Sequence, residues 1–126
     1  VGAKSPFKRA VRDSLEKAGR YVKAVMKLAA DHPRENGLQE TRASALCTMS
    51  QVQMLNGNFT EALKSADEAA SLFRQRSHQR NQGSACLLRA DALRAMEKYK
   101  ESQNAALEAI TLFKACDPPD VKGQES

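Results

Sequence analysis

The chain resembles itself after a shift of 40 residues, and this internal repeat constrains its fold more than any other feature. Residues 45–74 then align with residues 85–114. Seven aligned pairs are identical: Ala45 and Ala85, Glu61 and Glu101, Ala66 and Ala106, Glu68 and Glu108, Ala69 and Ala109, Leu72 and Leu112, and Phe73 and Phe113. A repeat of this length predicts one structural unit built more than once, with a core buried between neighbouring units.

Each unit has the apolar spacing of two successive helices. Apolar residues of the first unit recur every three or four positions, at Ala45, Met49, Val52 and Leu55 and at Phe59, Ala62, Ala66, Ala69 and Phe73. The second unit repeats this spacing, at Ala85, Leu88, Ala92 and Ala95 and at Tyr99, Ser102, Ala106, Ala109 and Phe113. Such spacing lines one face of a helix. The breaks at 56–58 and 97–98 are very short, which predicts antiparallel helix hairpins.

A weaker third copy lies upstream, at a shift of 38 residues. The spacing of Gly57, Phe59, Ala62 and Ala66 recurs there, at Gly19, Tyr21, Ala24 and Leu28. A first helix here would begin with Ser5 as N-cap and Pro6 at the first helical position, and would bury Phe7, Val11, Leu15 and Ala18. The second helix would end near residues 31–33, because proline disfavours helix in the residue before it.

We therefore predict an all-α chain of three antiparallel hairpins, six helices in total. The repeats are expected at about 5–34, 36–76 and 82–117, after an N-terminal tail at 1–4. Two prolines after Asp117 end the last helix, and residues 118–126 have the polar composition of a tail.

The repeat resembles the tetratricopeptide repeat (TPR) family over roughly residues 5–117. The residues that carry the resemblance are Gly57, Phe59, Ala62, Ala66 and Ala69, then Tyr99, Ala106 and Ala109, then Gly19, Tyr21, Ala24 and Leu28. The chain departs from the family in its period of 38–40 residues, in having no Trp, and in Arg12 at a position that is usually small. The resemblance implies a right-handed α-solenoid whose concave groove is lined by the first helix of each pair.

Members of this family hold peptides or partner proteins, so the resemblance implies a partner-binding groove. Its positions correspond to Arg9, Asp13, Glu16, Cys47, Gln51, Met54, Leu87, Asp91 and Arg94. One branch of the family clamps the C-terminal carboxylate of chaperones with basic and amide residues. Asp13 and Leu88 stand at two of those positions and do not bind a carboxylate, so this partner is not expected.

The positive charge is concentrated near the N-terminus. The chain carries 20 basic and 15 acidic residues, and residues 1–34 alone hold nine basic and three acidic ones. Arg20, Lys23 and Lys27 recur at helical spacing and form a basic patch. This patch is either a solvated face or a surface for an acidic partner. Nucleic acid is the weaker alternative, because the repeat assigns Tyr21 to packing rather than to base stacking.

The sequence favours a binding protein over an enzyme. It contains no Gly-rich phosphate loop, no H-E-x-x-H motif and no Cys/His cluster at zinc spacing, so we expect no cofactor, metal or small-molecule substrate. Cys47 and Cys86 are interpreted as small packing residues, with a redox-labile thiol in the groove as the alternative.

The odd cysteine count favours a reducing intracellular compartment, either the cytoplasm or an organelle interior. Cys47, Cys86 and Cys116 include no C-x-x-C pair. A first residue of Val leaves room for a removed targeting segment. No apolar run approaches the roughly 20 residues of a membrane-spanning helix.

The function expected from these patterns is a non-catalytic scaffold or adaptor that binds a partner segment in its concave groove. The alternative is a subunit built permanently into a larger complex through its basic first hairpin and its last helix. In that helix Ile110, Leu112 and Phe113 have no following helix to cover them. RNA binding is a third interpretation, and the patterns leave the oligomeric state open.

Overall fold

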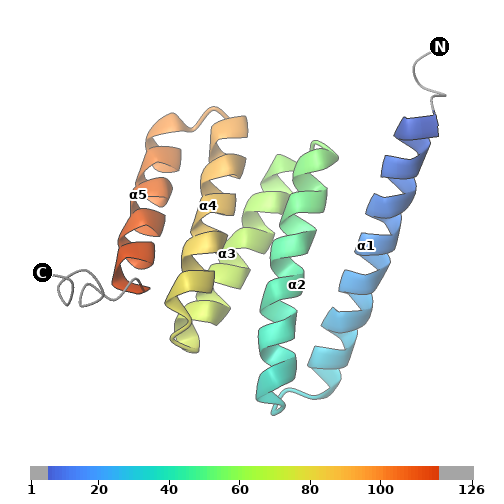
Figure 1. Cartoon of the computed structure of the whole chain (residues 1–126), viewed down its shortest axis with the longest axis horizontal. Coiled ribbons are helices and arrows are strands. Elements are labelled where there is room, and N and C mark those ends of the chain that lie inside the picture. Colours follow the sequence, from blue (N-terminus) through green and yellow to red (C-terminus); the bar gives the residue numbers. More distant parts are fainter. Residues whose placement is uncertain (1–5, 117–126) are drawn as a thin grey trace, which may run out of the picture.

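Five helices stand side by side in a computed structural model that describes residues 6–116, with side chains described from Lys8 onward (Figure 1). They are α1 (Pro6–Asp31), α2 (Asn36–Leu55), α3 (Phe59–Gln75), α4 (Gln79–Ala95) and α5 (Tyr99–Cys116). The described residues contain no strand, which confirms the predicted all-α class. Ser5 and the predicted tails lie outside the described residues.

The first predicted hairpin is wrong, because α1 is one continuous helix of 26 residues and the helices number five rather than six over the described chain. Gly19 lies inside α1 and does not adopt a positive φ. A single glycine costs a helix only about 1 kcal/mol, and the residues from Leu15 to Lys23 are otherwise good helix formers. Consequently Tyr21 and Leu28, which the repeat assigned to packing, are 59% and 50% exposed.

The other three connections share one turn geometry. In each, a residue with positive φ follows the helix: Gly57 at 80°, Ser77 at 61° and Glu97 at 62°. Its N–H donates to the carbonyl three residues back at 2.9–3.1 Å, and the next N–H donates to the carbonyl five residues back at 2.8–2.9 Å. These are the two bonds of a Schellman motif. Since the three turn residues are 20 positions apart, the 40-residue repeat consists of two helix-and-turn units of equal length.

Each helix packs against its neighbours along the row, and α2 also touches α4. The predicted helix hairpins α2–α3 and α4–α5 are present. Their core is narrow because small side chains fill it: Ala62, Ala66 and Ala69 of α3 are fully buried. Phe73 is 3% exposed, so the predicted packing face of α3 is confirmed. Leu55, expected on the packing face of α2, is 71% exposed and lies outside the core.

A buried hydroxyl joins the two helices of each hairpin at equivalent positions. Ser50 of α2 is fully buried, and its Oγ donates to the Ala62 carbonyl of α3 at 2.8 Å. Forty residues later the side chains are exchanged, because Ala90 stands on α4 and Ser102 stands on α5. Ser102 Oγ donates to the Ala90 carbonyl at 2.7 Å. Both hairpins therefore satisfy the same contact with one serine each.

The connection from α1 to α2 is held by a side chain rather than by a Schellman turn. Gln39 is buried, and its Nε2 donates to the carbonyl of Ala29 at 3.0 Å and to that of His32 at 3.2 Å. These carbonyls lie in the last turn of α1 and directly after it, and each also accepts a backbone N–H, from His32 at 3.3 Å and from Glu35 at 3.2 Å. The amide of Gln39 thus fastens the last turn of α1 to α2.

Candidate functional site

A cleft separates the N-terminal half of α1 from the C-terminal end of α2. The C-terminal half of α1 packs on α2 through Val22, Val25 and Ala29, all of them buried. Toward its N-terminus, α1 diverges from α2 (Figure 1). The space between the two helices has a volume of about 740 Å³. It is the direct result of the missing first hairpin, since no helix folds back there to fill it.

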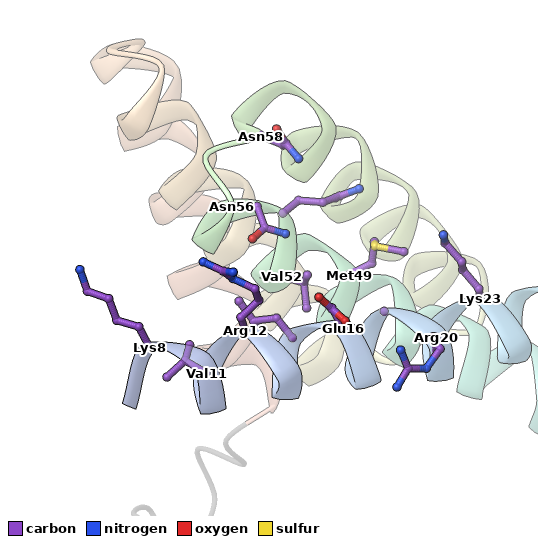
Figure 2. Close-up of a pocket in the computed structure, with 13 residues that line it drawn as sticks. Lys8, Val11, Arg12, Glu16, Arg20, Lys23, Met49, Val52, Asn56 and Asn58 are labelled. Carbon is purple, nitrogen blue, oxygen red and sulfur yellow. The ribbon is translucent and has the colours of Figure 1, made fainter. Parts of the chain in front are cut away.

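The cleft has an apolar floor and a polar rim. One face of α1 and the facing turns of α2 form it, and Figure 2 shows the α1 side chains along one side and Met49, Val52 and Asn56 along the other. The lining residues are Lys8, Val11, Arg12, Leu15, Glu16, Gly19, Arg20, Lys23, Met49, Val52, Gln53, Asn56 and Asn58. Four of these side chains are basic and one is acidic, so the cleft is positively charged at neutral pH.

Three of the basic side chains have no anionic partner in the structure. Arg12, Arg20 and Lys23 are exposed and form no ion pair with any described residue. Some basic side chains outside the cleft are paired, as in the contact of Arg42 Nη2 with Glu68 Oε2 at 2.5 Å between α2 and α3. The positive charge of these three side chains is therefore available to a ligand.

The predicted basic patch is divided by this cleft. Arg20 and Lys23 line it, whereas Lys27 is exposed on the same helix outside it. The patch was correctly expected on one helix, but the contributions of Lys8 and Arg12 were missed. Helical spacing from Lys8 through Arg12 to Lys23 is visible in the sequence, and only the assumed turn at Gly19 concealed it.

The nine residues of the predicted groove occupy three helices. On α1, Arg9 and Asp13 are exposed outside the cleft and Glu16 lines it. The other six occupy equivalent positions, 40 residues apart, on α2 and α4: Cys47, Gln51, Met54, Leu87, Asp91 and Arg94.

These two sets of three differ in exposure. On α2, Cys47 and Met54 are half-buried and Gln51 is exposed. The three on α4 are all exposed, with Leu87 at 43%. The carboxylate of Asp91 pairs with Arg94 Nη2 at 3.7 Å, one turn along the same helix. Four of the six residues are thus exposed and two are half-buried; together they are called the strip across α2 and α4, and none of them lines the cleft.

The two inner cysteines are poor nucleophiles. Burial raises the pKa of the Cys47 thiol to about 11. Burial, and then the nearby Glu108 carboxylate, raise the pKa of Cys86, which is fully buried. The reactive form of cysteine is the thiolate. Both thiols therefore stay protonated at neutral pH, which favours the interpretation as packing residues.

A second charged cluster joins three helices. Arg89 of α4 lies between two carboxylates, with Nε 2.5 Å from Asp67 of α3 and Nη1 3.6 Å from Glu108 of α5. A smaller cleft of about 280 Å³ beside it is lined by these three side chains and by Leu63 and Leu93. Because the charges of this cluster are already paired with one another, its role is to hold α3, α4 and α5 together.

No described group of three or more His, Cys, Asp and Glu side chains is placed to hold a metal ion. None of the five helices is both long and apolar enough to cross a membrane. Comparison with protein-family models, with curated proteins and with solved structures finds no match to this chain.

Proposed function

We propose that the chain is a non-catalytic protein-binding module of the tetratricopeptide type. The observation that carries the proposal is the cleft between α1 and α2, which combines an apolar floor with unpaired basic side chains. Helical arrays present extended surfaces on which a partner segment can lie. The apolar floor supplies binding energy, and the charged rim orients the partner and speeds its association.

The family assignment is supported by the regularity of the array. The two hairpins α2–α3 and α4–α5 repeat after 40 residues, use the same turn, and share the serine contact between their helices. The strip across α2 and α4 is a second surface for the same function. Gln51 is its exposed polar member on α2, and Leu87 is its exposed apolar member on α4.

Selection of peptides from a random library on the immobilised full chain tests this function. We expect recurring sequences that bind with micromolar dissociation constants, measured by calorimetry with the synthetic peptides. Chemical shift changes would then map each peptide to the cleft or to the strip across α2 and α4. Failure to enrich any binding sequence, in a library that yields binders for a known peptide-binding protein, would overturn the proposal.

A permanent subunit is the second candidate, because both end helices carry exposed apolar side chains. On α1 these are Tyr21 and Leu28, and on α5 they are Leu107 and Ile110, at 54% and 46% exposure. Faces of this kind are covered in obligate complexes. Sedimentation of the purified chain distinguishes the two candidates. Concentration-dependent association that is lost in the variant Leu107→Ser/Ile110→Ser favours the subunit, and a stable monomer favours the module.

A further inference from the structure

We propose that the cleft between α1 and α2 binds an amphipathic helix of a partner protein whose apolar face is flanked by Asp and Glu side chains. This inference rests on the proposed binding function and names its site and the chemistry of the partner. It differs from the expectation based on family resemblance, because Glu16 is the only one of the nine expected groove residues that lines the cleft.

The dimensions of the cleft suit one helix. Its wall on α1 extends from Lys8 to Lys23, which are 15 positions apart or about 22 Å along the helix. The opposite wall runs along α2 from Met49 to Asn56. A ligand helix of about four turns spans this length. An extended peptide would leave most of its backbone N–H and C=O groups on the apolar floor without partners, because only a few polar side chains of the lining, such as Gln53 and Asn56, could pair with them.

The floor requires an apolar face on the ligand. Val11 is 41% exposed and Leu15 is half-buried on α1, and both line the cleft with Met49 and Val52 of α2. In the sequence, Val11 and Leu15 have the spacing of a buried face, yet no element of the described chain covers Val11. Apolar side chains of a ligand at i, i+3/i+4 and i+7 match such a floor.

The rim requires negative charge on the flanks of the ligand. Arg12, Arg20 and Lys23 are exposed and without an ion-pair partner among the described residues. Carboxylates of a ligand helix would form charge-assisted contacts with the two guanidinium groups and the ammonium group. Glu16 is the only carboxylate of the lining and lies between Arg12 and Arg20, so the ligand carries its acidic residues toward both ends rather than at its centre.

A second copy of this chain is a less suitable occupant. The exposed apolar face on α5 is accompanied by two basic and two acidic side chains, namely Lys100, Lys114, Glu101 and Glu108, and the exposed pair Tyr21 and Leu28 lies on the same helix as the basic side chains of the cleft. Neither face complements a basic cleft. The charge of the cleft therefore favours an acidic helix from a different protein.

The test uses the full chain and three synthetic peptides of 16 residues. The first is amphipathic, with Leu at helical spacing and Glu beside this apolar face toward both ends of the peptide. The second has the same composition in scrambled order, and the third replaces each Glu by Lys. We expect calorimetry at physiological ionic strength to show micromolar binding of the first peptide alone, because the scrambled peptide has no apolar face and the third is repelled.

Two charge-reversal variants of α1 locate the site. In Arg12→Glu/Lys23→Glu, both changes are in the cleft, and the peptide is expected to bind about tenfold more weakly. The control, Lys17→Glu/Lys27→Glu, changes the net charge equally on the same helix, but neither residue lines the cleft. Its affinity should change by less than about twofold, since neither side chain lines the cleft and exposed charges interact weakly through solvent at this ionic strength. Circular dichroism and the urea midpoint check that both variants fold.

The inference fails if the scrambled peptide binds as tightly as the amphipathic one or if the control variant loses as much affinity as the cleft variant. It also fails if a single-stranded RNA of 12 nucleotides binds the cleft more tightly than the peptide, which would identify a nucleic-acid site. Library peptides could also bind to the strip across α2 and α4 instead of the cleft. In that case Gln51→Ala/Leu87→Ser removes their binding and Arg12→Glu/Lys23→Glu does not. The proposed binding function is then retained, and the inference about the cleft is wrong. If nothing binds, both proposals are overturned.

Discussion

The exchanged serine contact between hairpins allows a quantitative test of how the array is held together. In Ser50→Ala the donor of the 2.8 Å hydrogen bond to the Ala62 carbonyl is removed from a fully buried site. A bond of this kind contributes about 1 kcal/mol to the free energy of unfolding. The higher helix propensity of Ala raises the free energy of unfolding of this variant by up to about 0.5 kcal/mol. We therefore expect a net loss of about 0.5–1 kcal/mol, measured by urea unfolding followed by circular dichroism.

The double variant Ser50→Ala/Ala62→Ser carries the decisive result. It gives the first hairpin the arrangement of the second, in which Ser102 Oγ donates to the Ala90 carbonyl at 2.7 Å. We expect it to recover most of the stability lost in the single variant. The exposed Ser84→Ala, whose hydroxyl bonds within its own helix at 3.3 Å, should cost nothing. A double variant that is less stable than Ser50→Ala would refute the equivalence of the two hairpins.

Three further outcomes follow from single residues. Glu97 has a positive φ that Gly adopts without strain, so Glu97→Gly should raise the free energy of unfolding, measured in urea, by about 0.5–1 kcal/mol. Gly57→Ala, at the equivalent position, should lower it by about 1 kcal/mol. A change of the same sign in both variants would contradict the shared turn. A Cβ on Gly83 would lie 2.9 Å from Phe113 Cε1. In a Phe113→Leu background, Gly83→Ala should raise the free energy of unfolding in urea by about 1 kcal/mol, which is the usual gain of Ala over Gly in a helix. With Phe113 present, the contact with the ring should cancel this gain. A gain with Phe113 present would show that the ring moves freely. Because burial raises the pKa of Cys47 from 9.0 to about 11, half-maximal alkylation should require a pH near 11 in the native chain and near 9 in urea; coincident profiles would refute the burial effect. As the pH rises, the unfolded chain releases this proton before the folded chain does. The contribution of the thiol to the free energy of unfolding is therefore complete below pH 9 and falls between pH 9 and 11. Over that range Cys47→Ala should lose less stability than the unsubstituted chain.

The two C-terminal hairpins could be predicted from sequence because periodicity and repetition agree there. The apolar face of α3 recurs on α5 after 40 residues, which locates both helices even though only one of the three Schellman turns contains glycine. Ser77 and Glu97 are poor turn signals in isolation. The 40-residue repeat therefore indicated the positions of these two turns, which their own residues did not indicate.

The N-terminal hairpin could not be predicted because its turn signal was a glycine alone. At Gly57 the following residue Asn58 has a non-helical backbone, with φ of −91° and ψ of 70°, before α3, and the chain reverses there. Gly19 is followed by Arg20, and neither residue prevents the helix from continuing. The face of Tyr21 and Leu28 has the spacing of a packing face, but packing requires a partner helix, and periodicity does not show whether one is present.

The candidate cleft was accordingly predicted only in part. Arg20 and Lys23 were identified from charge spacing, and Glu16 was identified from family resemblance. Val11 and Leu15 were assigned to a buried core, because residues 6–18 were expected to fold back as a separate helix. Their place in the cleft follows from the direction in which α1 continues past Gly19, which depends on the whole helix rather than on any local motif.

The contacts between helices join almost exclusively neighbours in the chain, and α1 and α5 each rest on a single helix. Loops between contacting segments are therefore short, and little chain entropy is lost in closing them, so folding is expected to be fast and to begin in either hairpin. The same arrangement means that α1 can detach without disturbing the contacts among α2, α3, α4 and α5. Its amides should exchange with solvent hydrogen before those of α3. A ligand that bridges α1 and α2 would slow this exchange by mass action, so the time course of exchange in α1 would report occupancy of the cleft.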